Sequence, residues 1–403
     1  MSKINITKSS PTKDFQITVV GGGLTGSLMV YILIKSNIIS KNKLCWIKPE
    51  KNIIFDNRVS FYNIKNFEGL KSYGLLKQFT KKDLSYITDI EVFNELQKKP
   101  LSFNEKDGLG VICKNYQIQK YILDSINKIK IINSKVVDTK VNDFERVIYL
   151  ENGEIISSNL VLAADGSKSK LRDLSSIKYL KHDLNHVALN GHLKLKHNFN
   201  HIARQAFLKE GPIGLLPINY KELYINFVWS IKKEFANKLN DDQKTLEILV
   251  KKLNLLYKQQ NLIFSPLIKK SPRHLLKIYK WPLKLVHVPK PFGNRIALIG
   301  DSAHSIHPLA GQGFNLSLED CFEILKILET SFKTGKEFGH PDHLFLFGQN
   351  RKKRTQLMTF STSSIFYTFT KNSKYLKKFL SLSMDELEKR KLKNIFKIIA
   401  SGN

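Results

Sequence analysis

Short apolar runs rich in β-branched residues alternate with helix-spaced segments along the first part of the chain. FQITVV at residues 15–20 leads through GGGLTG into the helical pattern SLMVYILIKSN, and LCWI at 44–47 follows where a βαβ unit would return its second strand. Residues 110–126 are expected to form a helix with its isoleucines on one stripe. This part of the sequence therefore predicts parallel strands joined by helices.

In the later part of the chain, apolar and polar residues alternate strictly. NLVLAADG at 159–166 is a further apolar strand, and the stretches between 185 and 231, such as ELYINFVWSI, alternate in the manner of an antiparallel sheet. A helical segment (242–258) and a basic strand (276–288) bring the chain back to the strand RIALIGD. From residue 314 onward the pattern is mostly helical. The prediction is a mixed α/β protein with a second, antiparallel layer.

Length and charge narrow the classes of function. With 403 residues the chain suits two interleaved or tandem domains, because single cores stop growing at about 250–300 residues. The net charge of +30 attracts anionic surfaces, but the basic residues are spread through nearly every segment, and no zinc-finger, RNP or basic-helix pattern occurs. We therefore expect an anionic lipid surface rather than nucleic acid as the partner of this charge.

The cysteine content and the lengths of the apolar runs indicate the cellular compartment of the protein. The three cysteines, Cys45, Cys113 and Cys321, are widely spaced and form neither a disulfide framework nor a metal knuckle, which fits a reducing compartment. The first fourteen residues are polar, and no run of 18 or more apolar residues occurs. We expect a cytoplasmic protein, either soluble or lying on a membrane surface.

The first motif with chemical content is GGGLTG, which carries GxGxxG spacing at Gly21, Gly23 and Gly26. Placed between a strand and a helix, such glycines let the backbone approach a pyrophosphate at the helix N-terminus. The alternative is a purely structural glycine turn. The acid that usually ends the second strand of such a unit is replaced by Lys48, with Glu50 two positions later.

Two further strand exits carry polar residues. ADGSKSKLR at 164–172 follows an apolar strand, and it can be read simply as an Asp-Gly turn with a capped helix. GDSAHSIHPLAGQGFNL at 300–316 follows the strand IALI, and its Asp301, His304 and His307 are spaced by threes. A metal site is disfavoured because a strand-exit loop does not place them on one helical face. The carboxylate can instead accept sugar hydroxyls, and the glycines ahead of the helix can present N–H groups to an anion.

Taken in this order and at these separations, the motifs resemble those of the group A flavin-dependent aromatic hydroxylases, most closely the ubiquinone-biosynthesis hydroxylase family. The resemblance covers about residues 15–370. It is carried by GGGLTG, RVS at 58–60, LGVICKN at 109–115, ADGSKSKLR, GPIGLLP at 211–217, FVW at 227–229 and above all GDSAHSIHPLAGQGFNL.

The resemblance implies FAD as the bound cofactor. It places the pyrophosphate on the early glycines and a ribityl hydroxyl on Asp301. It places the flavin ring along the loop that contains His307 and Leu309, with Pro308, Ala310 and Gly311 facing the flavin. It also implies that the positive end of the following helix lies near the part of reduced flavin that becomes anionic. The FAD-binding residues carried over are Gly21, Gly23, Gly26, Arg58, Gln119, Asp165, Gly166, Gly300, Asp301, Pro308, Gly311, Gln312, Gly313 and Asn315.

The implied chemistry is hydroxylation of a phenolic ring with O₂ and transiently bound NAD(P)H, through a C4a-hydroperoxyflavin. The resemblance places the wall of the substrate site on the sheet around Gly214 to Pro217 and Phe227 to Trp229. The substrate-binding residues would be Leu216, Pro217, Phe227 and Trp229. For each of these residues the alternative is an ordinary place in the core of the sheet. The sequence does not identify a side chain as the base that deprotonates the phenol, so no residue is named as catalytic. No metal is expected.

The resemblance implies a Rossmann-like FAD-binding domain interleaved with an antiparallel-sheet substrate domain, and a helical C-terminal region. The expected segments are an FAD-binding domain at 15–90, 106–180 and 289–335, a substrate-domain excursion at 91–105, the substrate domain at 181–288 and the C-terminal region at 336–403.

The C-terminal region departs from the family pattern. Thr355-Gln356 and Thr362-Ser363 stand where the family usually has acids. Further on, apolar residues at helical spacing among lysines at 389–399 predict a basic amphipathic helix, which either lies on an anionic membrane surface or packs on the protein itself.

The predicted activity is therefore FAD-dependent hydroxylation of a prenylated phenol or quinone precursor, by a cytoplasmic protein or one peripheral to the inner membrane. The alternatives are a hydroxylase of a soluble aromatic acid and a non-catalytic flavin-binding subunit of a quinone-biosynthesis complex.

Overall fold

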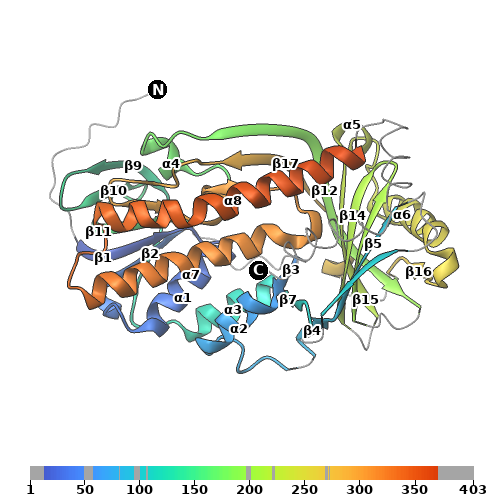
Figure 1. Cartoon of the computed structure of the whole chain (residues 1–403), viewed down its shortest axis with the longest axis horizontal. Coiled ribbons are helices and arrows are strands. Elements are labelled where there is room, and N and C mark those ends of the chain that lie inside the picture. The colour runs from blue at the N-terminus through green and yellow to red at the C-terminus, as the bar shows by residue number, and fades with distance from the viewer. Residues whose placement is uncertain are drawn as a thin grey trace.

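The computed structural model describes residues 13–49, 58–80, 82–94, 100–105, 108–196, 201–219, 223–267, 271 and 273–370. Two parts lie side by side along the long axis of the molecule (Figure 1). One part is built around a sheet with parallel central strands and the other around a nine-stranded, largely antiparallel sheet. The chain passes between the two parts several times, so the predicted α/β fold with an interleaved antiparallel-sheet domain is confirmed.

The first sheet has parallel central strands in the order β19-β11-β1-β2-β8, with β18 pairing at one edge. Ile17 and Val19 of β1 pack into one core, while Val20, on the opposite face, packs into a second core. Both faces are apolar because helices or further strands cover each of them. The strands are β1 (Lys13–Val20), β2 (Leu44–Lys48), β8 (Lys130–Asn133), β9 (Val136–Val141), β10 (Arg146–Leu150), β11 (Ile155–Ala163), β18 (Phe292–Gly293) and β19 (Ile296–Leu298).

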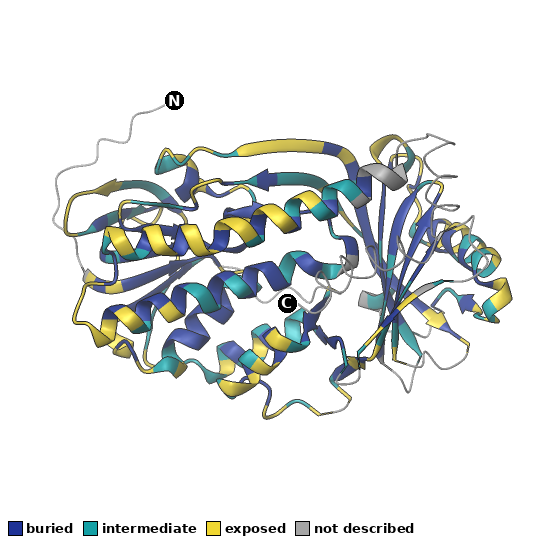
Figure 2. Cartoon of the chain, in the orientation of Figure 1, coloured by how far each residue is buried: buried dark blue, intermediate teal, exposed yellow. Residues whose placement is uncertain are grey.

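Helices cover the face of this sheet that bears Ile17 and Val19. Leu28 and Ile32 of α1 and Leu325 of α7 are buried in the same core as these two strand residues. Figure 2 shows that α1 and α7 are mostly buried where they approach the sheet. The helices of this part are α1 (Leu24–Ser36), α2 (Ile64–Ser72), α3 (Asn115–Ser125), α4 (Lys170–Leu174) and α7 (Gln312–Lys333).

The second sheet has the strand order β20-β17-β12-β15-β14-β13-β5-β6, with β16 pairing with β12. Side chains of α6 (Asp242–Leu256) pack on one of its faces, and α5 (Lys233–Ala236) lies beside it. Its strands are β5 (Asp89–Asn94), β6 (Leu101–Asn104), β12 (Leu180–Leu195), β13 (Ile202–Leu208), β14 (Gly211–Asn219), β15 (Tyr224–Lys232), β16 (Phe264–Ser265), β17 (Tyr279–His287) and β20 (His304–Ser305). The segment expected as an excursion, 91–105, supplies β6 and most of β5 to this sheet.

A small sheet and one long helix join the two parts. The small sheet consists of β3 (Val59–Asn63), β7 (Gly110–Lys114) and β4 (Leu84–Ile87) in the order β3-β7-β4. The helix α8 (Pro341–Thr370) lies against α7 and runs from the first part toward the second (Figure 1). Its outward face is exposed along most of its length (Figure 2).

The structure corrects one element of the sequence prediction. Residues 110–114 form the strand β7, not the start of a helix, and the helix begins only at Asn115. A short buried apolar run such as GVIC at 110–113 cannot be assigned to a strand or a helix by periodicity alone. The predicted amphipathic helix at 389–399 lies outside the described residues. No helix in the described part of the chain is long and apolar enough to span a membrane.

Candidate functional site: a cofactor cradle and an adjoining apolar cavity

The first strand exit is packed so closely that only glycine fits at two of its positions. Gly21 follows β1 with φ +132°, and a side-chain carbon there would lie closer than 3.0 Å to the carbonyl oxygen of Ala164. A side-chain carbon on Gly26 would approach the carbonyl of Gly21 equally closely. At Gly23 no atom of another described residue, apart from its chain neighbours, lies within 4 Å of such a carbon, so this face of the turn is open for a ligand.

The second strand exit lies directly beside the first. The N–H of Ala164, just beyond β11, donates to the Val20 carbonyl at 2.7 Å, which places Asp165 and Gly166 next to the glycine turn. One carboxylate oxygen of Asp165 accepts from the Leu171 N–H at 3.2 Å, and the other is buried with no partner among the described residues. Burial raises the pKa of Asp165, and hydrogen bonds from Ser169 and nearby backbone N–H groups offset part of this shift.

A cavity of about 640 Å³ opens at these two strand ends. Arg58 and Gln119 also line it, as predicted from the resemblance, and Gln119 Nε2 donates to the Gly22 carbonyl at 3.3 Å. Lys48 lines the cavity at the end of β2, where an acid would have been expected. Trp281, from the antiparallel sheet, closes one side, with the Arg58 guanidinium 5.5 Å from its ring centroid. The cavity is therefore lined by residues of both parts of the molecule.

The third strand exit, after β19, holds Gly300 and Asp301 in a short 3₁₀ turn, η4 (Gly300–Ser302). Gly300 has φ +63°, and its N–H donates to the buried Asp320 carboxylate at 2.8 Å. The same carboxylate lies 2.6 Å from His304 Nε2 and accepts from Arg351 Nε at 2.7 Å. Asp320 of α7 thus anchors the turn, and Asp301 is left exposed toward a second cavity.

The loop that follows leads to the N-terminus of α7. Pro308 precedes a 3₁₀ turn, η5 (Leu309–Gly311), in which Gly311 has φ +64°. The N-cap residue of α7 is Gly311, so no N-cap side chain bonds to the first turn of the helix, whose positive end faces the loop. Gln312 and Asn315 lie behind this loop, where Asn315 Oδ1 accepts from the Asn63 N–H at 2.9 Å and its Nδ2 donates to the Phe61 carbonyl at 2.8 Å. Asn315 thus connects α7 to β3, Gln312 Oε1 accepts from Asn315 Nδ2 at 3.3 Å, and neither of these two predicted cofactor residues lines either cavity.

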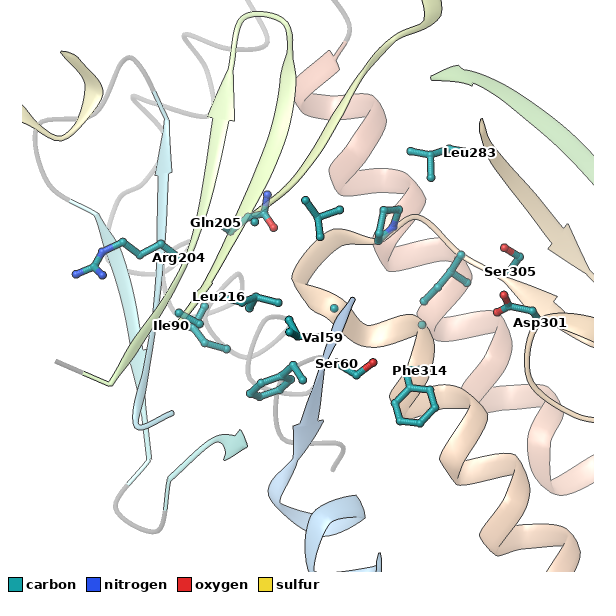
Figure 3. A pocket seen from close by; sticks show the side chains of 18 residues that line it. Val59, Ser60, Ile90, Arg204, Gln205, Leu216, Leu283, Asp301, Ser305 and Phe314 are labelled. Atoms are coloured by element: carbon teal, nitrogen blue, oxygen red, sulfur yellow. The ribbon is translucent and has the colours of Figure 1, made fainter. Parts of the chain in front are cut away.

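The second cavity, of about 260 Å³, lies between this loop and the antiparallel sheet (Figure 3). Its lining residues are mostly apolar, and they come from β3, the sheet and the loop. They include Val59, Phe61, Ile90, Gly214, Leu216, Val228, Leu283, Ile306, Pro308, Gly311, Gly313 and Phe314. The side chains with polar atoms are those of Ser60, Arg204, Gln205, Asp301 and Ser305.

The four predicted substrate residues do not come together here. Leu216 lines the cavity, and Pro217 is buried nearby in β14. Phe227 and Trp229 are fully buried in the core beneath α6, on the other face of the sheet, and Val228 between them faces the cavity. Gln205 was not identified from the sequence. The alternation of RQAFL would have marked it as sharing a face with Phe207, but not which face lines the cavity.

Behind the loop lies a buried aromatic cluster. The rings of His307 and Phe366 are stacked at a centroid distance of 4.2 Å, and the ring of His186 meets Phe366 edge-on at 4.9 Å. Burial lowers the pKa of His307 to about 3, with a further contribution from His186, so His307 is neutral at physiological pH. The described residues hold no group of three metal-ligating side chains close enough to bind an ion.

The geometry fits FAD. Among the described residues, the space at Gly23 in front of the N-terminus of α1 is open, as a pyrophosphate requires, and Asp165 has an unpartnered buried oxygen beside the turn. Consecutive residues line the two cavities, since Arg58 lines the larger and Val59 the smaller. An elongated cofactor with a flat ring system can therefore run from the glycine turn to the loop at Pro308.

Comparison with known proteins agrees with this assignment. The model of the FAD binding domain family matches residues 14–343. The ubiquinone biosynthesis monooxygenase COQ6, mitochondrial, of Dictyostelium discoideum is 25% identical over 463 aligned positions, which cover 98% of this chain and 93% of that protein.

Two solved structures are similar in fold. p-Nitrophenol 4-monooxygenase PnpA from Pseudomonas putida DLL-E4 has a TM-score of 0.74 at 15% identity, with 96% of this chain and 97% of that chain covered. Klebsiella pneumoniae HpxO, complexed with FAD and uric acid, has a TM-score of 0.72 at 14% identity, with 95% and 97% covered. With the family model matching most of its length, the chain belongs to the FAD binding domain family, and it is a flavoprotein of the group A aromatic monooxygenase type.

Proposed function

We propose that this protein hydroxylates the aromatic ring of a prenylated phenol in ubiquinone biosynthesis, with FAD bound and with NAD(P)H and O₂ as co-substrates. The proposal is supported by the relatives named as ubiquinone biosynthesis monooxygenases, which cover most of the chain. The observation that carries it is the apolar cavity between the Pro308 loop and the antiparallel sheet, which offers an aromatic ring a place beside the flavin site.

In the net reaction, one oxygen atom of O₂ enters a ring C–H bond and the other leaves as water. NAD(P)H and a proton together supply the two electrons and two protons that form this water, and NAD(P)⁺ is released. When bound, FAD supplies the redox chemistry that joins these two half-reactions.

The contribution of the chain is to bind, orient and exclude water. The Gly23 turn and the N-terminus of α1 would hold the pyrophosphate, and Asp301 would accept a ribityl hydroxyl. The N-terminus of α7, behind Gly311, would stabilise negative charge on the reduced ring. Apolar side chains of the second cavity, such as Leu216 and Phe61, would keep water from the reacting ring.

The proposal is tested with the purified, FAD-loaded protein. We expect NAD(P)H oxidation to rise when a prenylphenol is added, and mass spectrometry to show one atom of ¹⁸O from labelled O₂ in the product. A soluble phenolic acid of the same ring pattern serves as the comparison substrate. Incorporation into the acid but not the prenylphenol would contradict the substrate class. A protein that keeps FAD but oxidises no NAD(P)H with any phenol would favour the non-catalytic subunit instead.

A further inference from the structure

Gln205 lies on the sheet wall of the smaller cavity. Ala206 and Leu208, its neighbours along β13, pack into the core beneath α6, so Gln205 belongs to the opposite face. Figure 3 shows its side chain directed into the cavity, while Arg204 points away from it. Arg204 Nε donates to Glu91 at 2.8 Å, which holds that charge outside the cavity.

The neighbouring strand leaves a space beside this carboxamide. Gln205 is in register with Gly214 of β14, which in turn is in register with Val228 of β15. A side-chain carbon built on Gly214 would have one neighbouring heavy atom within 4 Å, Gln205 Oε1 at 3.6 Å. The wall therefore has an indentation above Gly214, with an amide group at its edge.

Apart from Arg204, whose side chain points away, the other polar side chains that line the cavity belong to the flavin side. Ser60 lies on β3, Asp301 on η4 and Ser305 on β20, and Figure 3 shows them across the cavity from Gln205. Gln205 is only 5% exposed, so a hydrogen bond made there is shielded from competing water. A carboxamide can donate to a phenolate oxygen or accept from a phenol hydroxyl.

We propose that Gln205 binds the ring hydroxyl of the phenol substrate and that the space above Gly214 receives the ring edge. The two residues would then determine specificity for a hydroxylated ring and orient it against the flavin loop. This inference rests on the proposed function and adds a recognition residue to it.

The test compares two ligands and two forms of the FAD-loaded protein. Binding of a prenylphenol and of the analogue without the hydroxyl is measured from the perturbation of the flavin absorbance spectrum. We expect the wild type to prefer the phenol at least roughly tenfold, because an unmade buried hydrogen bond is costly. Gln205→Leu has nearly the same size and should bind both ligands about equally.

Three further variants separate recognition from structure. Gln205→Asn keeps the amide and should retain part of the preference. Gly214→Ala adds a carbon at ordinary contact distance and should weaken the binding of both ligands without loss of FAD. Gln349→Leu makes the same chemical change on the exposed face of α8 and should leave the preference unchanged.

The outcomes distinguish this inference from the proposed function. If Gln205→Leu retains FAD and still prefers the phenol as strongly as the wild type, Gln205 does not recognise the hydroxyl. If Gln205→Leu does not fold, an unchanged preference in Gln205→Asn together with unchanged binding in Gly214→Ala overturns the inference. A wild type that holds FAD but binds no phenol contradicts the proposed function itself.

Discussion

Gly26→Ala is expected to abolish retention of FAD and to lower the stability of the protein. The added carbon would lie closer than 3.0 Å to the Gly21 carbonyl, which is backbone of the tight turn and cannot rotate away. Overpacking of this kind costs about 1–3 kcal/mol, and moving the turn displaces the N–H groups that would face the pyrophosphate. The measurements are the flavin absorbance of the purified protein and the melting temperature of its FAD-free form.

Gly23→Ala is the matched control within the same motif. Its added carbon has no neighbour within 4 Å in the described part of the chain beyond the adjoining residues, so the FAD-free form should melt within about 1 °C of the wild type. Because the carbon occupies the space in front of the helix N-terminus, FAD affinity should still fall roughly tenfold or more. Equal FAD affinity in Gly23→Ala and the wild type would show that the cofactor does not approach this turn.

Asp320→Ala is expected to destabilise the protein by about 3–5 kcal/mol, because it leaves Arg351 with a buried charge that lacks its closest partner. It also removes the acceptor for the Gly300 N–H and the partner of His304. The loss is measured by urea unfolding. Glu68→Gln, which breaks an exposed pair with Lys71, is the control and should change stability by less than about 1 kcal/mol. A loss as small as that of the control would mean that the Asp320 cluster does not stabilise the fold.

The same cluster gives a pH dependence. Burial alone would raise the pKa of Asp320, but His304, Arg351 and the Gly300 N–H together lower it below its usual value. A carboxyl whose folded pKa is depressed contributes stability above its unfolded pKa, near 4, and loses that contribution as pH falls through the folded pKa. The difference in free energy of unfolding between wild type and Asp320→Ala should therefore be largest at pH 7 and decrease below about pH 4. An unchanged difference at low pH would contradict this assignment.

The sequence predicted where the ligand-binding strand ends lie better than it predicted which face of the antiparallel sheet lines the cavity. GGGLTG, ADG and GDS each follow a β-branched run, and parallel strands bring their carboxyl ends to one edge, so their convergence could be expected. For FVW at 227–229, alternation shows that Val228 faces away from Phe227 and Trp229, but not which face packs on a helix and which lines a cavity. That choice depends on α6, whose docking no local pattern encodes. Gln205 was missed for the same reason.

The contacts of Gln312 and Asn315 also could not be predicted from the neighbouring sequence. Polar residues at a helix start after two glycines suggest ligand contacts, yet the structure uses the Asn315 carboxamide to join α7 to β3, about 250 positions earlier in the sequence. Hydrogen bonds between such distant segments leave no periodic signal. Lys48, by contrast, was identified from the sequence as standing at the end of the second strand, and it lines the larger cavity there.

The order of strands in the first sheet has a consequence for biosynthesis. β11 is in parallel register with β19, and six of the nine strands of the antiparallel sheet, β12 to β17, are encoded between them. A ribosome adding about 5–20 residues per second needs on the order of ten seconds to pass from one to the other. During that interval the nascent chain exposes an unpaired edge of β11, and the Gly300 turn has not yet been synthesised. We therefore expect the growing polypeptide to depend on chaperones at this stage and to acquire its yellow colour only after most of it has left the exit tunnel.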